Sequence, residues 1–345
     1  MSTRNKIAIL LGVCVLAIAA TVGALLRNQS DNRRAKQHST PVAQTSFAEL
    51  ATAPRIVFRS TSRASNYGAV AAVALSDPSG PRGYLEAGTA PVQCDRVYAT
   101  AANLLCLASD RGIVTTYSAD IYRTADGSAS KEQNLPLAGV PSRARLSADG
   151  KLAATTSFVQ GDSYAATTFS TRTVVSRVGG ASYGSLEDFR LIHQGKAIKP
   201  ADRNYWGVTF AADDNTFYAT VEWGQHTWLV RGSLAERTVR TLVEDAECPS
   251  LAPDGRNIVY KQRGDRPKGQ WRLVDYDVAT GRVTPLAEQH SVDDQVEWLD
   301  DQHVLYGLPR SGTDAAESDV WSVPIDGSGS PKLVIPEAWS PAVIR

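Results

Sequence analysis

One motif recurs along this chain: a short apolar run, a turn that contains aspartate, and a second apolar run. The clearest copy is "ECPSLAPDGRNIVYKQR", Glu247 to Arg263, and the turn aspartates of the four copies lie 64, 41 and 47 residues apart. Gly, Asn and Asp accept the positive φ angles of tight turns between antiparallel strands. Repeats of about 40–50 residues that hold several strands are typical of propeller blades. The turn aspartates are therefore expected to be structural: Asp149, Asp213, Asp254 and Asp301.

A second strand pair follows each copy, most clearly in "QWRLVDYDVATGRVTPLAE", residues 270–288. Four strands make one blade, and six such units fit the chain. The interval of 64 residues indicates an insertion, which we expect near residues 179–189. We predict an all-β fold, a six-bladed β-propeller, with blades over residues 55–87, 94–137, 143–192, 205–242, 248–288 and 295–335.

The C-terminus predicts how the ring of blades closes. The first unit has only three candidate strands, whereas "SPAVIR", Ser340 to Arg345, resembles the first strand of a new unit. We expect this segment to be the innermost strand of blade one, because a ring closed in this way leaves no exposed sheet edge at the seam.

The N-terminus carries an uncharged apolar run from Ile7 to Leu26. Twenty helical residues span about 30 Å, the thickness of the hydrocarbon core of a bilayer. Arg4 and Lys6 precede the run, which favours a cytoplasmic tail over residues 1–6. We predict a transmembrane helix over residues 7–26, a flexible tether over 27–54 and the propeller over 55–345, outside the cytoplasmic membrane. A signal peptide cleaved near Val22 to Ala24 is the alternative, and the propeller would then be secreted.

Charge and cysteines narrow the function classes. The chain is formally neutral with a pI near 7, which argues against a nucleic-acid partner. An exported domain can form disulfides. We expect one between Cys94 and Cys106, which lie on two neighbouring antiparallel strand patterns, and the alternative pairs Cys94 with Cys248.

The repeats "LSADGK" and "LAPDGRNIVY" resemble the Pro-Asp-Gly repeat of TolB-like, WD40-like propellers, over about residues 55–345. The runs "CDRVYAT", "SRARLS", "WGVTF" and "DDQVEWLDD" are similar to an actinobacterial family of exported or membrane-anchored TolB-like proteins without established activity. TolB itself carries an α/β domain before its propeller, whereas this chain shows only a tether there. The resemblance therefore implies the fold and carries over no partner.

Five residues are candidates for contact with a ligand or partner. Arg143 and Arg145 share one strand face, and Gln295 and Glu297 share another. They and Trp206 lie on predicted innermost strands, which border the central channel. Two interpretations stay open: the charged residues pair between blades because a buried charge needs a partner, or they contact a ligand at the mouth of the channel.

Catalytic and metal motifs give no comparable signal. "GASYG", residues 180–184, matches the G-x-S-x-G pattern around Ser182, but no strand–turn–helix pattern surrounds it. The five histidines show no zinc-site spacing, so we expect no metal and no cofactor.

We therefore predict a non-enzymatic, envelope-anchored scaffold that binds an envelope protein or ligand of unknown identity. The alternative is a propeller hydrolase or lyase that acts on envelope polymers from a site at the channel mouth. Converging ionisable side chains around an open pocket would favour the enzyme, and a channel plugged by apolar side chains would oppose it.

Overall fold

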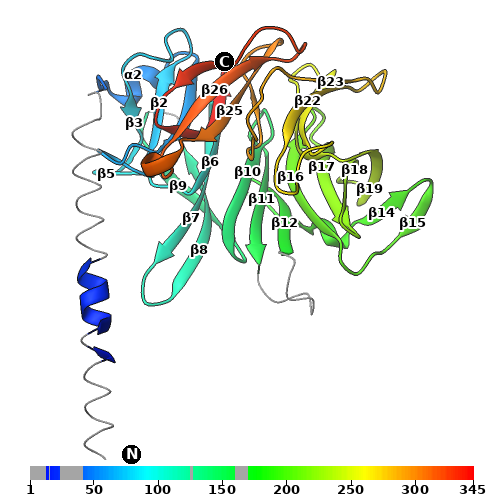
Figure 1. Ribbon diagram of the computed structural model, residues 1–345, viewed down its shortest axis with the longest axis horizontal. Helices are drawn as coiled ribbons and strands as arrows, with labels where there is room; N and C mark the ends of the chain where they lie inside the picture. The colour runs from blue at the N-terminus through cyan, green and yellow to red at the C-terminus, as the bar shows by residue number, and fades with distance from the viewer. Residues whose placement is uncertain (1–12, 15, 24–41, 125–126, 160–169) are drawn as a thin grey trace, which may run out of the picture.

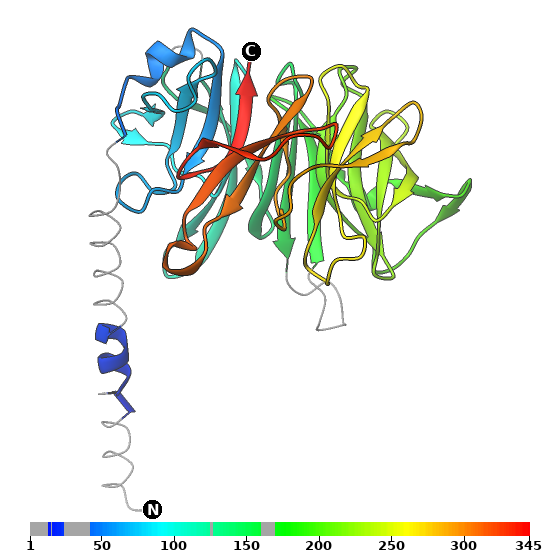
Figure 2. The same ribbon diagram turned by 45° about the horizontal axis from the view of Figure 1, so that its top comes forward.

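The computed structural model describes residues 13–14, 16–23, 42–124, 127–159 and 170–345. Six main sheets follow one another along the chain, one for each predicted blade, and neighbouring strands are antiparallel except for one parallel pair in the fourth sheet. Figures 1 and 2 show the blades side by side, with the C-terminus at the top of Figure 1 and the β7–β8 hairpin projecting at the bottom. The prediction of a six-bladed propeller is confirmed.

The first three blades each contain four strands. Blade one also carries a small two-stranded extension, β4 (Glu86–Ala87) with β5 (Ala90–Pro91). From the innermost strand outward, the blades are β28 (Ala338–Ile344), β1 (Arg55–Ser60), β2 (Val70–Ala74) and β3 (Gly83–Tyr84); β6 (Arg96–Ala99), β7 (Asn103–Arg111), β8 (Thr115–Arg123) and β9 (Ser130–Pro136); and β10 (Val140–Leu146), β11 (Leu152–Val159), β12 (Ser170–Arg177) and β13 (Ser182–Ser185).

Blades four to six follow the same plan, with two short 3-10 helices in the connections, η1 (Leu186–Asp188) and η2 (Gly312–Asp314). Their strands, again from the innermost outward, are β16 (Asn204–Phe210), β17 (Thr216–Trp223), β18 (His226–Ser233) and β19 (Thr238–Glu244); β20 (Glu247–Leu251), β21 (Asn257–Gln262), β22 (Arg272–Asp277) and β23 (Val283–Pro285); and β24 (Glu297–Trp298), β25 (His303–Pro309), β26 (Ser318–Pro324) and β27 (Lys332–Ile335).

The C-terminal strand β28 closes the ring. It pairs antiparallel with β1, with Ala342 opposite Val57 and Ile344 opposite Arg55. It also contacts β6 of blade two and β24 of blade six. The predicted closure by "SPAVIR" is confirmed, and β28 joins the last part of the chain to its first blade.

Apolar clusters between neighbouring blades form the core. Along β1, Val57 packs toward blade two, whereas Ile56 and Phe58 pack toward blade six. Alternate side chains of a strand point to opposite faces of its sheet, so a blade that packs on both faces needs apolar residues at successive positions. This explains runs such as "RNIVY", in which apolar and polar residues do not alternate strictly.

The insertion lies slightly later than predicted. Most of residues 179–189 form a turn, β13 and η1, so the outer strand of blade three falls there. The extra hairpin is β14 (Arg190–His193) with β15 (Lys196–Ile198), and β14 pairs in parallel with β19 of blade four. The predicted end of blade three at residue 192 is therefore wrong, because strand β14 extends the next sheet instead.

The predicted tether also ends earlier than residue 54. Helix α2 (Phe47–Ala51) packs on blade one with Phe47 buried, and the Thr45 backbone amide donates to the Arg82 carbonyl. A Cβ added to Gly83 would lie 2.8 Å from Phe47 Cα, so glycine permits this close approach. Part of this polar segment is thus a fixed component of the propeller, because the apolar "FAELA" turn within it finds a buried site.

Residues 13–14 and 16–23 are helical and exposed. Within the part of the chain that the structure describes, no helix is both long and apolar enough to cross a bilayer. Residues 1–12, 15 and 24–41 lie outside the described residues, and with them the cytoplasmic tail, much of the predicted transmembrane segment and most of the tether. The membrane anchor stays a prediction.

Candidate ligand-binding site at the channel mouth

The centre of the channel holds a buried ion pair between blades three and six. Arg145 Nη1 on β10 donates to Glu297 Oε2 on β24, and only 7% and 8% of the two side chains is exposed. The Tyr98 hydroxyl donates to the other Glu297 oxygen at 3.4 Å, and the Arg145 guanidinium lies 4.5 Å from the centre of the Tyr98 ring. Burial raises the pKa of Glu297, while the neighbouring Arg145 opposes that rise. This geometry is that of the predicted blade-to-blade pair.

A second charged cluster lies beside this pair. Arg143 Nη2 lies 3.2 Å from Asp293 Oδ1, and the same oxygen accepts from Lys261 Nζ at 2.7 Å. The Lys261 ammonium also sits 4.1 Å from the centre of the Trp271 ring. Burial raises the pKa of Asp293, but Lys261 and Arg143 outweigh it and hold that pKa at about 2. Charged side chains therefore fill the centre of the channel, so it is not plugged by apolar side chains.

The other two candidate residues are Gln295 and Trp206. Gln295 Nε2 donates to the carbonyls of Val208 and Pro249, so this side chain links blade six to blades four and five. A cavity of about 20 Å³ remains among Arg143, Arg145 and Gln295, which is room for about one water molecule. Trp206 on β16 is buried. It lines neither this cavity nor the larger pocket that is described next.

The larger pocket has a volume of about 320 Å³, and it is lined where β28 and β10 begin and where β1, β7 and β25 end. We call it the mouth pocket. Its charged lining residues are three arginines and one carboxylate: Arg59, Arg96, Arg111 and Asp95. The lining therefore has a formal charge of +2, and anions are the ligands that it favours.

Arg96 lies between the two spaces and lines both of them. Its side chain is 20% exposed and stacks 5.2 Å from the centre of the Trp339 ring. Its Nη1 atom is buried, makes no hydrogen bond within the described residues, and lies 4.0 Å from the nearest Asp294 oxygen. Burial first, and then the positive charge of Arg143, lower the pKa of Arg96 to about 10. Asp294 and Asp293 oppose this shift, and the guanidinium is charged at neutral pH.

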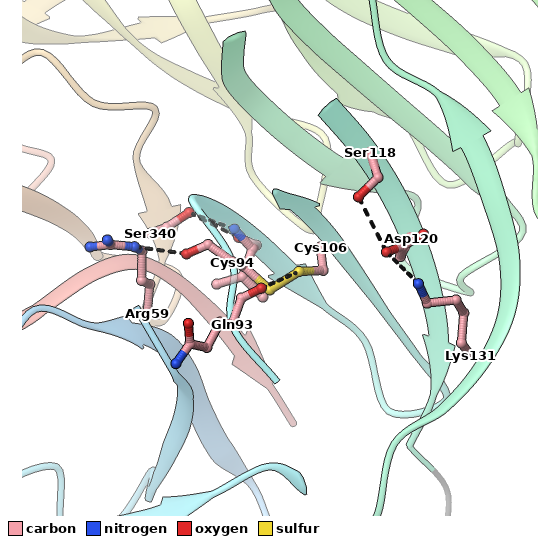
Figure 3. Close-up of a disulfide and its surroundings, with 9 residues drawn as sticks. Arg59, Gln93, Cys94, Cys106, Ser118, Asp120, Lys131 and Ser340 are labelled. Carbon is pink, nitrogen blue, oxygen red and sulfur yellow. Dashed lines mark hydrogen bonds and ion pairs between the residues drawn. A yellow bond between two sulfur atoms is a disulfide. The ribbon is translucent and has the colours of Figure 1, made fainter. Parts of the chain in front are cut away.

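The pocket wall is anchored by a disulfide. Cys94 and Cys106 are joined, with their Cα atoms 5.4 Å apart, and this is the pairing expected from the sequence (Figure 3). The Cys94 carbonyl accepts from Arg59 Nε at 2.8 Å, so the disulfide helps to position that arginine. The alternative partner, Cys248, is a buried free thiol. The Arg59 guanidinium in turn lies 4.6 Å from the centre of the Tyr67 ring.

Arg59, Arg96 and Arg111 were not among the residues predicted for the site. Arg96 was visible in "CDRVYAT", at the start of an innermost strand, and this position could have identified it. Arg59 and Arg111 lie at the ends of second strands. Their convergence with Arg96 depends on the ring closing through β28, which puts blades one and two next to each other around the mouth.

The catalytic sequence motifs do not assemble into a site. Ser182 begins β13, where its Oγ donates to the Val175 carbonyl and accepts from the Gly184 amide, so it has a structural role in a strand. No cluster of three or more His, Cys, Asp or Glu residues that could hold a metal occurs in the described ranges.

Comparisons with known proteins find structural relatives only. No protein-family model and no curated protein sequence matches the chain. TolB from Acinetobacter baumannii superposes with a TM-score of 0.59 at 16% identity, over 85% of this chain and 67% of the TolB chain. The chain folds as a TolB-like propeller. A chain in the nidogen/laminin complex is also similar, with a TM-score of 0.53 and 11% identity over 84% of this chain and 98% of that one. At such identities the likeness of this TolB-like propeller to both structures is one of fold.

Proposed function

We propose that this TolB-like propeller is a binding protein held outside the cytoplasmic membrane, and that it captures an anionic group of its ligand or partner in the mouth pocket. The observation that carries the proposal is Arg96. Its side chain is 20% exposed and lines the mouth pocket together with Arg59 and Arg111, against one carboxylate, so an anion in the pocket would pair with a guanidinium whose nearest protein carboxylate oxygen lies 4.0 Å away.

The rest of the pocket supports the same assignment. Arg59 is held by the Cys94 carbonyl and the Tyr67 ring, so one further cation is fixed at the wall. The Asp95 carboxylate accepts from Ser109 Oγ at 2.6 Å, so a hydrogen bond within the pocket wall already satisfies one of its oxygens. Aromatic rings and fixed guanidinium groups around a pocket of this size are suited to a carboxylate or phosphate that carries an apolar neighbour.

The glycoside-hydrolase form of the enzyme alternative lacks such support. Acid–base cleavage of glycosidic bonds uses two carboxyl groups that face the substrate. Of the described residues that line the mouth pocket, Asp95 alone is a carboxylate, and the carboxylates deeper in the channel lie beside cations: Arg96, Arg143, Arg145 and Lys261. We therefore propose a role in binding.

Thermal unfolding in the presence of inorganic phosphate tests the proposal. With a dissociation constant of about 5 mM, phosphate at about 50 mM would stabilise the folded state by about 1.4 kcal/mol, or about 3 °C, relative to sodium chloride of equal ionic strength. Arg96→Gln should abolish this shift. Arg256→Gln is the matched control, because Arg256 is an exposed arginine in the turn after β20, away from the pocket. Equal phosphate shifts in both variants would contradict the assignment.

The proposed location of the propeller outside the cytoplasmic membrane is tested separately. A phosphatase reporter fused after Arg345 should be active, because that enzyme needs an oxidising compartment. An inactive phosphatase fusion, together with activity of a second reporter that works only in the cytoplasm, would contradict the proposed side of the membrane and leave the phosphate result unaffected.

A further inference from the structure

Exposed apolar side chains gather on the face that carries the mouth pocket. Seven large apolar side chains are exposed in the described part of the propeller, and five of them lie on this face. The remaining two, Leu242 and Leu333, lie on outer strands of blades four and six. The five belong to blades one to three, and we call them the apolar rim: Tyr67, Ile113, Val114, Val140 and Phe158.

The rim is continuous with the pocket. Tyr67 and Val140 line the mouth pocket, and Phe158 lies opposite Val140 in the β10–β11 register. Arg111 lines the pocket at the end of β7, two residues before Ile113. The apolar side chains and the arginines therefore meet the same partner.

The outermost part of the rim is the tip of the β7–β8 hairpin. Ile113 is fully exposed and Val114 is 74% exposed. Both flanking strands are nine residues long, and Figure 1 shows the hairpin projecting beyond its blade on the side away from the C-terminus. A projecting pair of β-branched apolar residues is unfavourable in water and marks a surface that contacts a membrane or another protein.

The charges around the mouth pocket indicate whether the surface of that membrane or protein is negatively or positively charged. The mouth pocket carries three arginines against one carboxylate. Residues 27–41 carry Arg27, Arg33, Arg34 and Lys36 against Asp31. This basic segment is repelled by the arginines of the pocket, so it is a poor occupant of the pocket, and both it and the pocket attract an anionic surface.

We propose that the mouth face rests on an anionic phospholipid surface, with Ile113 and Val114 inserted among the headgroups and a lipid phosphate bound by Arg59, Arg96 and Arg111. This rests on the proposed function, because it names the lipid headgroup as the source of the anion. Amphipathic surfaces that combine apolar tips with basic residues bind in the headgroup region of bilayers in this way, and tyrosine is enriched at that level.

The chain length fits this arrangement. Propeller packing begins by Ala43, whose carbonyl accepts from the Arg82 amide, so sixteen residues, 27–42, separate it from the predicted anchor. Sixteen residues reach about 55 Å at most. A propeller of this size is thus held within about its own diameter of the membrane, where a weak surface contact acts at high effective concentration.

The test uses the full chain in lipid nanodiscs made of phosphatidylcholine alone or with about 30% phosphatidylglycerol. An environment-sensitive fluorophore is attached at Ile113→Cys in a Cys14→Ser background; Cys248 is buried and stays. The matched control is Leu333→Cys, which is 51% exposed on the outer strand of blade six and away from the mouth. In the anionic nanodiscs the fluorophore at 113 should shift to the blue, brighten by about threefold, and be quenched by spin-labelled lipid, because it enters the headgroup region. The fluorophore at 333 should do none of these.

The outcomes separate the two proposals. A probe at 113 that stays in water on both nanodiscs overturns lipid docking, and so does emission that is the same at 113 and 333. If Arg96-dependent stabilisation by phosphate persists in that case, the mouth pocket binds a different anion, and the proposed function stands. Quenching that survives Arg96→Gln but disappears in Val114→Asp would show docking through the apolar tip alone, which overturns the phosphate part of this inference.

Discussion

Replacing Arg145 by methionine should destabilise the propeller strongly. The Arg145 and Glu297 side chains are 7% and 8% exposed, so the substitution leaves a buried carboxylate whose remaining side-chain partner is the Tyr98 hydroxyl. Breaking one partner of a buried ion pair costs about 3–5 kcal/mol. For a domain of this size that corresponds to a fall in Tm of about 6–10 °C.

The effect should depend on pH. Burial raises the pKa of Glu297, and loss of Arg145 removes the charge that opposes this rise. A carboxyl group whose folded-state pKa lies above its unfolded value of about 4.3 contributes stability below that value and loses it as pH rises through the folded pKa. The penalty of Arg145→Met should therefore be smaller near pH 4 than at pH 8.

Thermal or urea unfolding of four proteins measures this: wild type, Arg145→Met, Glu297→Leu and the double variant. The double variant should lose less stability than Arg145→Met, because it buries no uncompensated charge. Lys151→Met is the control, since Lys151 forms an exposed pair with Asp149 and the substitution should change stability little. A loss for Arg145→Met no larger than that of Lys151→Met, or equal losses at both pH values, would refute the structural role and return Arg145 to the ligand-contact candidates.

Three further predictions concern the scaffold. Replacing both Cys94 and Cys106 by serine should lower the free energy of unfolding by about 3 kcal/mol, as for a disulfide that closes a loop of this length. Peptide mapping of the wild type without reductant should recover the two cysteines in one linked fragment, and a free Cys106 in that map would contradict the structure. Deleting residues 341–345 should unfold or aggregate the propeller, because it removes the buried Ala342 and Ile344 and opens the edge of β1; unchanged melting would show that β28 does not close the ring. Burial raises the pKa of Asp275 to about 6, so ionisation of this side chain lowers the stability of the fold as pH rises through that value. Asp275→Asn should therefore be neutral near pH 4 and stabilising by about 1–3 kcal/mol at pH 8. Equal effects on stability at the two pH values would count against this pKa shift.

The sequence predicted the fold well because each blade is specified locally. The Asp turns, the spacing of strands and the isolated "SPAVIR" were enough to place six blades and their closure. Two boundaries failed for a common reason. Arg190 to His193 and Phe47 to Ala51 pack on neighbouring elements, β19 and blade one, that local patterns do not specify.

The site was harder to predict. The pairing of Arg145 with Glu297 could be anticipated, since innermost strands meet at the channel. Whether such residues face water or one another depends on the distances across the ring, which no single repeat contains. Arg59 and Arg111 lie in blades one and two, and only the closed ring brings them to one pocket with Arg96.

Crystals grown or soaked with selenate at millimolar concentration test the central claim most directly, because anomalous scattering from selenium locates an oxyanion without ambiguity. We expect the strongest anomalous peak in the mouth pocket, within hydrogen-bond distance of the Arg96 guanidinium, and its loss in Arg96→Gln crystals grown in the same way. A mouth pocket without a selenate peak in wild-type crystals, while the anion occupies other surface arginines, would contradict the assignment of this pocket as an anion-binding site.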